Sequence, residues 1–280
     1  MSDEPTKSRS PEPTKPPASS RTRVFVWVTA LVVVAAAVGV AAWAQLAHRG
    51  PQLYGFKVVE AYPHDRNAFT QGLVIDHGRL YEGTGQYGAS SIRRVDLASG
   101  RVEKIHGLDR EYFGEGITIL GNKLYEITWK SGLAFVYDVD TFNVVQTFQY
   151  PTEGWGLTHD GEHLIMSDGS ATLRFLDPAT FKTQREITVH DGDEPVPKLN
   201  ELEYVEGEIW SNVWYDDRIA RISPADGRVI GWIDLAEIYP HGARRGDDVL
   251  NGIAYDSAAR KIYVTGNNWP QLYQIDVIRR

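Results

Sequence analysis

A segment that repeats five times constrains the fold of this chain more than any other feature of the sequence. Each copy begins with a polar or bulky residue followed by a short apolar run, and the copies recur with a period near 40 to 45 residues. The runs are Gln71-Gly72-Leu73-Val74, Glu115-Gly116-Ile117-Thr118, Trp155-Gly156-Leu157-Thr158, Asn200-Glu201-Leu202-Glu203 and Asn251-Gly252-Ile253-Ala254. Strand-like repeats of this length are typical of β-propellers, in which each repeat forms one blade.

Further strands follow the first run of each copy in a constant order. Second strands are predicted at 80–82, 124–126, 164–166, 209–211 and 262–264, and third strands at 93–96, 135–138, 174–177, 220–223 and 273–276. Four copies add a fourth strand near 100–102, 142–144, 181–183 and 227–229. The last copy lacks one, and the alternating segment 54–61 supplies it by pairing the two ends of the domain. The sequence therefore predicts an all-β, five-bladed β-propeller over residues 54–280.

The residues before this domain divide into three parts. Residues 1–23 are rich in Pro, Ser, Thr and charge, which predicts a disordered tail. Residues 24–44 are apolar or small apart from Thr29, and a run of 21 such residues is long enough to span a bilayer as a helix. Residues 45–53 form the predicted linker to the propeller.

The basic residues of the tail predict the orientation of this membrane helix. Five Lys and Arg residues precede it, so the positive-inside rule places the tail in the cytoplasm and the propeller outside it. Ala42-Trp43-Ala44 resembles a signal-peptidase site, but the apolar run is longer than in cleaved signals, which favours an uncleaved anchor. We expect a membrane-anchored domain that is extracytoplasmic, periplasmic in a bacterium, and exported if the chain is cleaved after Ala44.

Composition excludes several classes of function. The net charge is −8 and the pI about 5.5, so the chain offers no basic surface for nucleic acid. It contains 0 Cys, which excludes disulfides, a thiolate nucleophile and Cys-ligated zinc. The sequence also lacks the G-x-S-x-G motif of serine hydrolases and a Lys-containing phosphate loop.

The residues that precede the apolar runs are the candidates for a functional site. The first strand of a propeller blade lies along the central channel, so these residues should surround one mouth of it. They differ from copy to copy, which the fold alone does not require: Gln71, Glu115, Trp155, Asn200 and Asn251.

Glu115 is the candidate acid or base in this group. Aromatic side chains are expected around the same mouth, namely Phe69, Phe113, Trp129, Trp155 and Trp214. Apolar rings remove water from a carboxyl group and raise its pKa, so that it can hold a proton near neutral pH. The alternative is that the rings fill a propeller core and Glu115 only caps a turn.

Several motifs in this order resemble the plant and bacterial glutamine cyclotransferases. The resemblance extends over residues 54–278 and depends on the number, order and spacing of the motifs. They are Phe69-Thr70-Gln71-Gly72-Leu73, Phe113-Gly114-Glu115-Gly116, Glu153-Gly154-Trp155-Gly156-Leu157, Leu199-Asn200-Glu201-Leu202-Glu203-Tyr204, Asn212-Val213-Trp214 and Leu250-Asn251-Gly252-Ile253-Ala254.

The resemblance implies an enzyme that converts the N-terminal Gln of peptides and proteins to pyroglutamate and releases ammonia. It implies that Glu115 is catalytic, relaying a proton from the attacking amine to the departing nitrogen, and that no catalytic zinc or other cofactor is needed. In the mechanism we expect, Gln71, Asn200 or Asn251 steadies the oxyanion, while the aromatic side chains bind the substrate. One departure concerns Asn267, which stands where many members have Lys.

Other interpretations remain open at this point. His159 and His163 have a spacing that suits a metal on a helix, but the Asp-Gly between them predicts a hairpin turn. Residues 191–194 are acidic but lack the ligand spacing of a calcium loop. Two rival functions are a non-catalytic propeller that binds a protein partner, and a metal-dependent propeller hydrolase or lactonase that EDTA would inactivate.

Overall fold

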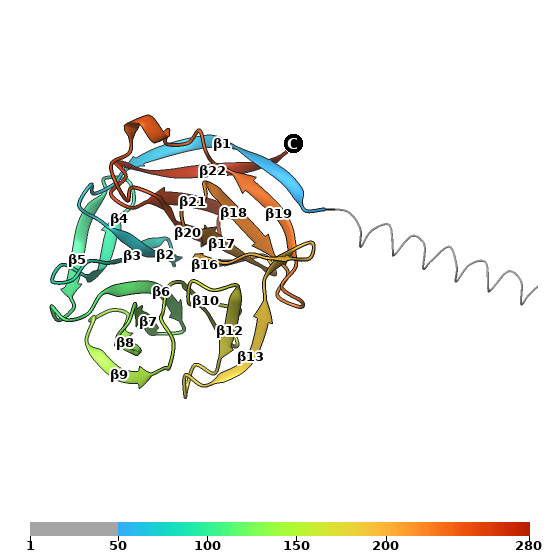
Figure 1. Ribbon diagram of the computed structural model, residues 1–280. Helices are drawn as coiled ribbons and strands as arrows, with labels where there is room; N and C mark the ends of the chain where they lie inside the picture. Colours follow the sequence, from blue (N-terminus) through green and yellow to red (C-terminus); the bar gives the residue numbers. More distant parts are fainter. Residues whose placement is uncertain (1–49) are drawn as a thin grey trace, which may run out of the picture. The chain divides into compact units, whose positions relative to one another are not determined.

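The computed structural model describes residues 50–280. These residues form β-strands joined by turns, and Figure 1 shows the sheets arranged around a common centre. The predicted all-β fold is confirmed. The predicted tail at 1–23, the predicted anchor at 24–44 and residues 45–49 of the linker lie outside the described residues. Within 50–280, we find no helix with the length and apolar character that crossing a bilayer requires.

Three sheets each contain four antiparallel strands that follow one another in the chain. The first consists of β2 (Thr70–Asp76), β3 (Arg79–Thr84), β4 (Ser91–Asp96) and β5 (Arg101–Gly107). The second consists of β6 (Gly114–Leu120), β7 (Lys123–Thr128), β8 (Leu133–Asp138) and β9 (Val144–Gln149). The third consists of β10 (Leu157–His159), β11 (Leu164–Ser167), β12 (Thr172–Leu176) and β13 (Thr183–Thr188).

A fourth sheet has eight strands in the order β16-β17-β18-β19-β1-β22-β21-β20. One half contains β16 (Leu199–Val205), β17 (Glu208–Val213), β18 (Arg218–Ile222) and β19 (Val229–Asp234). The other half contains β20 (Leu250–Asp256), β21 (Lys261–Gly266), β22 (Gln271–Arg279) and β1 (Gln52–Pro63).

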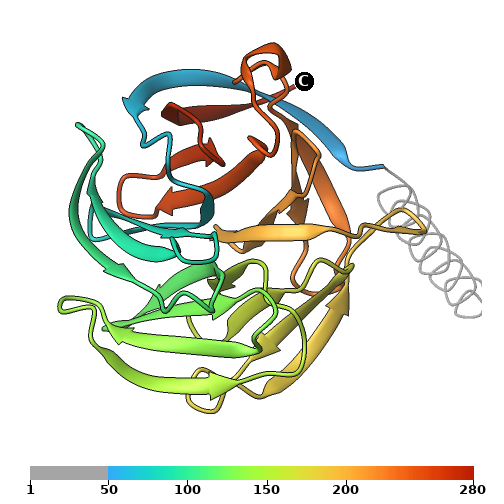
Figure 2. The same cartoon turned by 60° about the vertical axis from the view of Figure 1, so that its left-hand side comes forward.

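Strand β1 closes the fold by pairing the two ends of the described chain. It runs antiparallel to β22, and Figure 2 shows the blue strand β1 beside the red strand β22. The register runs from Tyr54 opposite Arg279 to Pro63 opposite Gln271. A short parallel pairing with β19 joins the two halves of the eight-stranded sheet. The predicted pairing of segment 54–61 with the last copy is confirmed. Strand β1 begins at Gln52, within the segment that the sequence assigned to the linker.

Two insertions interrupt the repeat. The first is a hairpin of β14 (His190–Asp191) and β15 (Glu194–Pro195), and the second contains the 3-10 helix η1 (His241–Ala243). The acidic segment 191–194 is therefore a hairpin turn, and the Asp191 carboxylate accepts the indole N–H of Trp232 at 2.8 Å. The segment between His159 and His163 connects the antiparallel strands β10 and β11. The predicted hairpin turn between His159 and His163 is confirmed.

The strands β2, β6, β10, β16 and β20 contact one another in turn and form a closed ring. Their backbones approach closely at the glycines of the repeat. A Cβ atom on Gly72 would lie 2.4 Å from the Ile117 nitrogen, and one on Gly156 would lie 2.0 Å from the Asn200 carbonyl oxygen. Glycine is therefore required for the ring to close at these positions.

Candidate functional site

The polar residues of the repeat lie at irregularities of the ring strands. The strand register shifts between Thr70 and Gly72, between Gly114 and Ile117, between Leu199 and Leu202, and between Leu250 and Ile253. A β-bulge redirects a side chain that a regular strand would place in the pleat. These four shifts contain Gln71, Glu115, Asn200 and Asn251, while Trp155 comes two residues before β10.

A cavity of about 260 Å³ lies where these residues meet. Eight of the nine predicted site residues line it: Phe69, Gln71, Phe113, Glu115, Trp129, Trp155, Asn200 and Trp214. Pockets for drug-sized ligands measure roughly 300–1,000 Å³. The smaller volume here suits a single amino-acid side chain.

The aromatic walls of the cavity are held by edge-to-face contacts. The Phe113 ring packs against Phe69 at a centroid distance of 6.2 Å and against Trp129 at 5.5 Å. Opposite them, Trp155 and Trp214 lie 5.5 Å apart at 85°. Such pairs are stabilising beyond their buried area, so the rings support one another within each wall.

Glu153 fixes two of these walls from behind. One of its carboxylate oxygens accepts the indole N–H of Trp129 at 2.9 Å and that of Trp155 at 3.0 Å. Sequence analysis quoted Glu153 only as part of a motif and gave it no role. A single carboxylate oxygen therefore sets the orientation of two indoles that come from different parts of the chain.

Glu115 is the buried carboxyl group of the cavity, with 4% of its surface exposed. Burial raises its pKa well above the ordinary value, and the negative charge of Glu153 raises it further. A side-chain hydrogen bond with Gln71 acts in the opposite direction and is the weaker influence. The net shift moves the carboxyl toward the pH range in which it can both accept and release a proton.

Asn251 orients Gln71 and does not line the cavity, unlike the place that sequence analysis expected for it. Its side-chain nitrogen donates to the Thr70 carbonyl oxygen at 2.9 Å and to the Gln71 amide oxygen at 2.6 Å. Both hydrogens of this amide are thereby used. Because the Gln71 oxygen faces Asn251, the Gln71 amide nitrogen is the group that can donate to Glu115.

Three further residues line the cavity that sequence analysis did not place there: Gln86, Asp247 and Asn267. Asp247 belongs to the insertion around η1, where the repeat provides no signal. Asn267 was noted only because Lys was expected there. Its amide oxygen is buried without a hydrogen-bond partner within the described chain, and so is that of Asn200. Buried orphan acceptors in a cavity indicate a ligand that donates hydrogen bonds.

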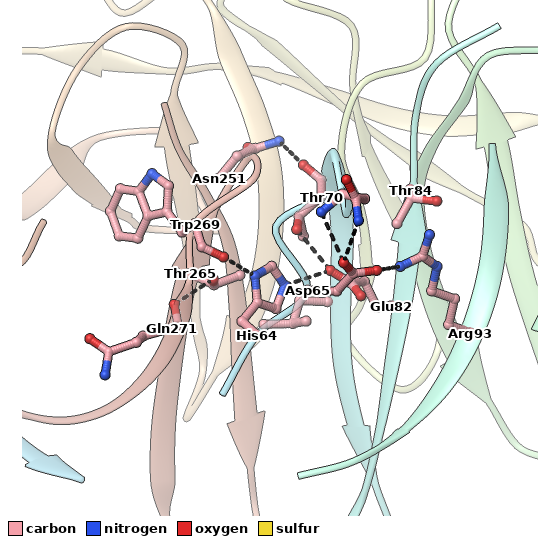
Figure 3. A network of polar contacts seen from close by, with 12 residues as sticks. His64, Asp65, Thr70, Glu82, Thr84, Arg93, Asn251, Thr265, Trp269 and Gln271 are labelled. Carbon is pink, nitrogen blue, oxygen red and sulfur yellow. Dashed lines mark hydrogen bonds and ion pairs between the residues drawn. The ribbon is translucent and has the colours of Figure 1, made fainter. Parts of the chain in front are cut away.

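A network around His64 connects the two chain segments that flank the cavity (Figure 3). One ring nitrogen lies 2.8 Å from Glu82, whose carboxylate also accepts the Thr70 hydroxyl, and the other lies 2.7 Å from the Trp269 carbonyl oxygen. Burial alone would lower the pKa of His64, but the charge and hydrogen bond of Glu82 outweigh burial and raise it. The network holds residues next to Gln71 and Asn267 in place.

The described residues contain no group of three or more His, Asp or Glu side chains placed to hold a metal ion. His159 and His163 lie on either side of the turn between β10 and β11 and belong to no such group. The Nδ1 atom of His159 instead accepts the Gly161 backbone N–H at 3.0 Å.

Comparison with known proteins agrees with this geometry. The family described as glutamine cyclotransferase matches residues 30–277. A glutaminyl-peptide cyclotransferase of Arabidopsis thaliana is 43% identical over 236 residues, which is 82% of this chain and 72% of that protein. The crystal structure of Myxococcus xanthus glutaminyl cyclase matches with a TM-score of 0.78 and 33% identity, covering 82% of this chain and 99% of that one. This chain therefore belongs to the glutamine cyclotransferase family.

Proposed function

We propose that this protein is a glutaminyl-peptide cyclotransferase that converts N-terminal Gln to pyroglutamate and releases ammonia. The observation that carries this proposal is the Glu115 carboxyl, buried with a raised pKa in an aromatic cavity sized for one side chain. We also propose that the domain is a five-bladed β-propeller. The closed ring of five inner strands supports that blade count.

The cavity accounts for the positioning of the substrate. Ring closure requires the flexible Gln side chain to fold back until its amide carbon meets its own α-amine. The aromatic walls around Phe113 and Trp155 restrict the side chain to such compact conformations. Holding two reacting groups together in this way removes a large part of the entropic barrier.

Glu115 moves the proton that the reaction must transfer. A bond forms between the α-nitrogen and the amide carbon, the carbon–nitrogen bond to the departing group breaks, and one proton passes from the amine to that group. Glu115 takes this proton and delivers it to the nitrogen that leaves as ammonia. General acid–base catalysis of this kind contributes typically ~10²–10⁴-fold.

Asn200 and Asn267 explain the choice of Gln over Glu. Their buried amide oxygens lack donors, and an N-terminal Gln offers N–H groups on both its amine and its carboxamide. An N-terminal Glu keeps the amine, but its ionised side chain has only acceptors and leaves unsatisfied the oxygen that the carboxamide would reach. Of the three residues expected to steady the oxyanion, Asn251 has no hydrogen left to donate.

The proposed reaction uses no metal ion. This part of the proposal is supported by the position of Glu115 and by the lack of a cluster of metal-ligating side chains among residues 50–280. The test is mass spectrometry of a Gln-initiated peptide incubated with residues 50–280 in EDTA, beside the Glu115→Gln variant. Ammonia loss with the wild type alone supports the proposal. Activity that EDTA abolishes favours the metal-dependent hydrolase, and no turnover favours a binding propeller.

We further propose that residues 24–44 anchor the enzyme in a membrane with the propeller on the extracytoplasmic side. The support is the apolar run of the sequence and the basic residues that precede it. Carbonate extraction of membranes, followed by protease treatment of intact cells or spheroplasts, tests both points. Recovery of the full-length chain in the soluble fraction would contradict the anchor.

A further inference from the structure

A second cavity of about 560 Å³ adjoins the one that contains Glu115. The two share Phe69, Gln86 and Asp247 in their walls. A peptide whose first residue fills the inner cavity must continue into another space, and the outer cavity adjoins the inner one through these shared residues. The following inference rests on the proposed function, because it concerns the residues that come after the N-terminal Gln.

The walls of the outer cavity are charged rather than aromatic, and its acidic groups are already engaged. Asp248 is buried, and its carboxylate accepts the Arg245 backbone N–H at 2.8 Å and the Asn268 amide at 3.3 Å. Asp247 accepts the Tyr215 hydroxyl at 2.6 Å. These contacts use part of the hydrogen-bonding capacity of the two carboxylates and come from neutral donors.

The basic groups of the same cavity are uncommitted. Arg66 and Arg245 both line it and are exposed, and neither guanidinium forms an ion pair with any residue in the described part of the chain. A guanidinium group recognises a carboxylate with two parallel hydrogen bonds. The two arginines balance the two carboxylates of the cavity wall in formal charge, but only the guanidinium groups lack an ion pair or hydrogen bond within the described chain.

We propose that the outer cavity binds the second and third residues of the substrate, and that Arg66 and Arg245 give the enzyme a preference for acidic side chains there. The substrate class is therefore peptides and proteins in which the N-terminal Gln is followed by Asp or Glu. A basic residue at these positions would meet the two free guanidinium groups and be disfavoured.

The experiment measures kcat/KM of the full-length protein on matched tetrapeptide amides. One peptide carries Glu at the second position, one carries Glu at the third, and two controls carry the neutral isostere Gln at those positions. We expect acidic peptides to be turned over about three- to fivefold more efficiently at low ionic strength, as for partly exposed ion pairs. The preference should appear mainly in KM and shrink as salt is added.

Variants assign the preference to the two side chains. Arg66→Gln and Arg245→Gln should each reduce the ratio of acidic to neutral peptide, and the double variant should bring it to about one. Arg79→Gln is the matched control, because it removes the same charge at the opposite end of β2 and β3. In the register of β2 and β3, Arg79 lies opposite Asp76 at one end of the two strands. Thr70 lies opposite Thr84 at the other end, which is the end near the cavity. This control should keep the wild-type ratio.

The outcomes separate this inference from the proposed function. Turnover of the neutral peptides with equal kcat/KM for acidic ones would overturn the preference and leave the cyclase intact. A preference that survives in the double variant would also overturn the role of the arginines. If no peptide releases ammonia, the proposed function fails and this inference fails with it.

Discussion

Glu115 and Glu201 are two buried carboxyl groups in the same ring of strands, with 4% and 1% of their surfaces exposed. Burial raises the pKa of both well above the ordinary value. They differ in what surrounds their oxygen atoms. The two oxygens of Glu201 accept backbone N–H groups of Leu73 at 3.2 Å and Ile253 at 2.9 Å. Glu115 lines the cavity, and Gln71 is the side chain that hydrogen-bonds to it.

This difference teaches that a raised pKa does not by itself identify a catalytic group. Glu201 occupies the position that glycine holds in the other four copies of the repeat, and its side chain joins β16 to both β2 and β20. Its hydrogen-bonding capacity is used to hold the ring together. Glu115 keeps capacity for a ligand and has a cavity through which the ligand arrives.

The largest expected effect comes from Glu115→Gln. The amide cannot relay a proton, so kcat should fall by ~10²–10⁴-fold. The folded protein should be at least as stable as the wild type, because a buried ionisable group has been removed. Steady-state kinetics and thermal unfolding on the same preparations check both points. Retained kcat would end the assignment of Glu115 as the proton relay.

Glu201→Gln should lower the stability of the protein and leave its kcat unchanged, the reverse of Glu115→Gln. Gln has one acceptor oxygen where Glu201 uses two, and its NH₂ group would face a backbone N–H. Leaving one buried donor unsatisfied should lower the free energy of unfolding by about 1–3 kcal/mol. Activity per folded molecule should be preserved. Denaturant unfolding combined with active-site kinetics measures this, and loss of kcat without loss of stability would contradict the comparison.

Glu203, two residues farther along β16, should make stability depend on pH. Burial raises its pKa to about 8. At a pH between the ordinary pKa of Glu in the unfolded chain and this raised pKa, Glu203 is protonated in the folded state and ionised in the unfolded state. The free energy of unfolding therefore falls as the pH rises. The slope is at most about 1.4 kcal/mol per pH unit for one group.

Glu203→Gln removes this contribution. Unfolding free energies measured from pH 5 to pH 8 should decline less steeply in the variant than in the wild type. Glu162→Gln, which changes an exposed carboxyl on the β10–β11 turn, is the control and should retain the wild-type slope. Identical slopes in all three proteins would show that Glu203 does not titrate in this range.

The smallest effect is expected from Glu153→Gln, which tests the environment of Glu115. The amide oxygen can still accept both indole N–H groups, but the negative charge that raises the pKa of Glu115 is gone. The acidic limb of the pH profile of kcat should therefore move to lower pH, with a modest change in the maximum. If the acidic limb of the profile stays at the same pH, the ionisation that it reports belongs to a group other than Glu115.

The sequence was sufficient to predict most of the ring and most of the cavity. The alternation of apolar residues and the repeated glycines are local consequences of strand pairing and close backbone approach, so the strands can be recognised in all copies and the glycine in four of the five. The first residues of the five apolar runs were expected at one mouth, and four of the five line the cavity. Asn251 differs because its partners, Thr70 and Gln71, are about 180 residues away in the chain.

What the sequence determined by itself is the strand order, the closure by residues 54–61 and the set of residues from which the site is drawn. Only the tertiary structure decided which of those residues line the cavity and which hold the ring of strands together. It placed Glu153 behind two indoles, used Asn251 and Glu201 to hold the ring, and brought Asp247 and Arg245 from an insertion to the cavity. The physical reason is that hydrogen-bond partners and burial depend on segments far apart in the chain, which no local pattern records.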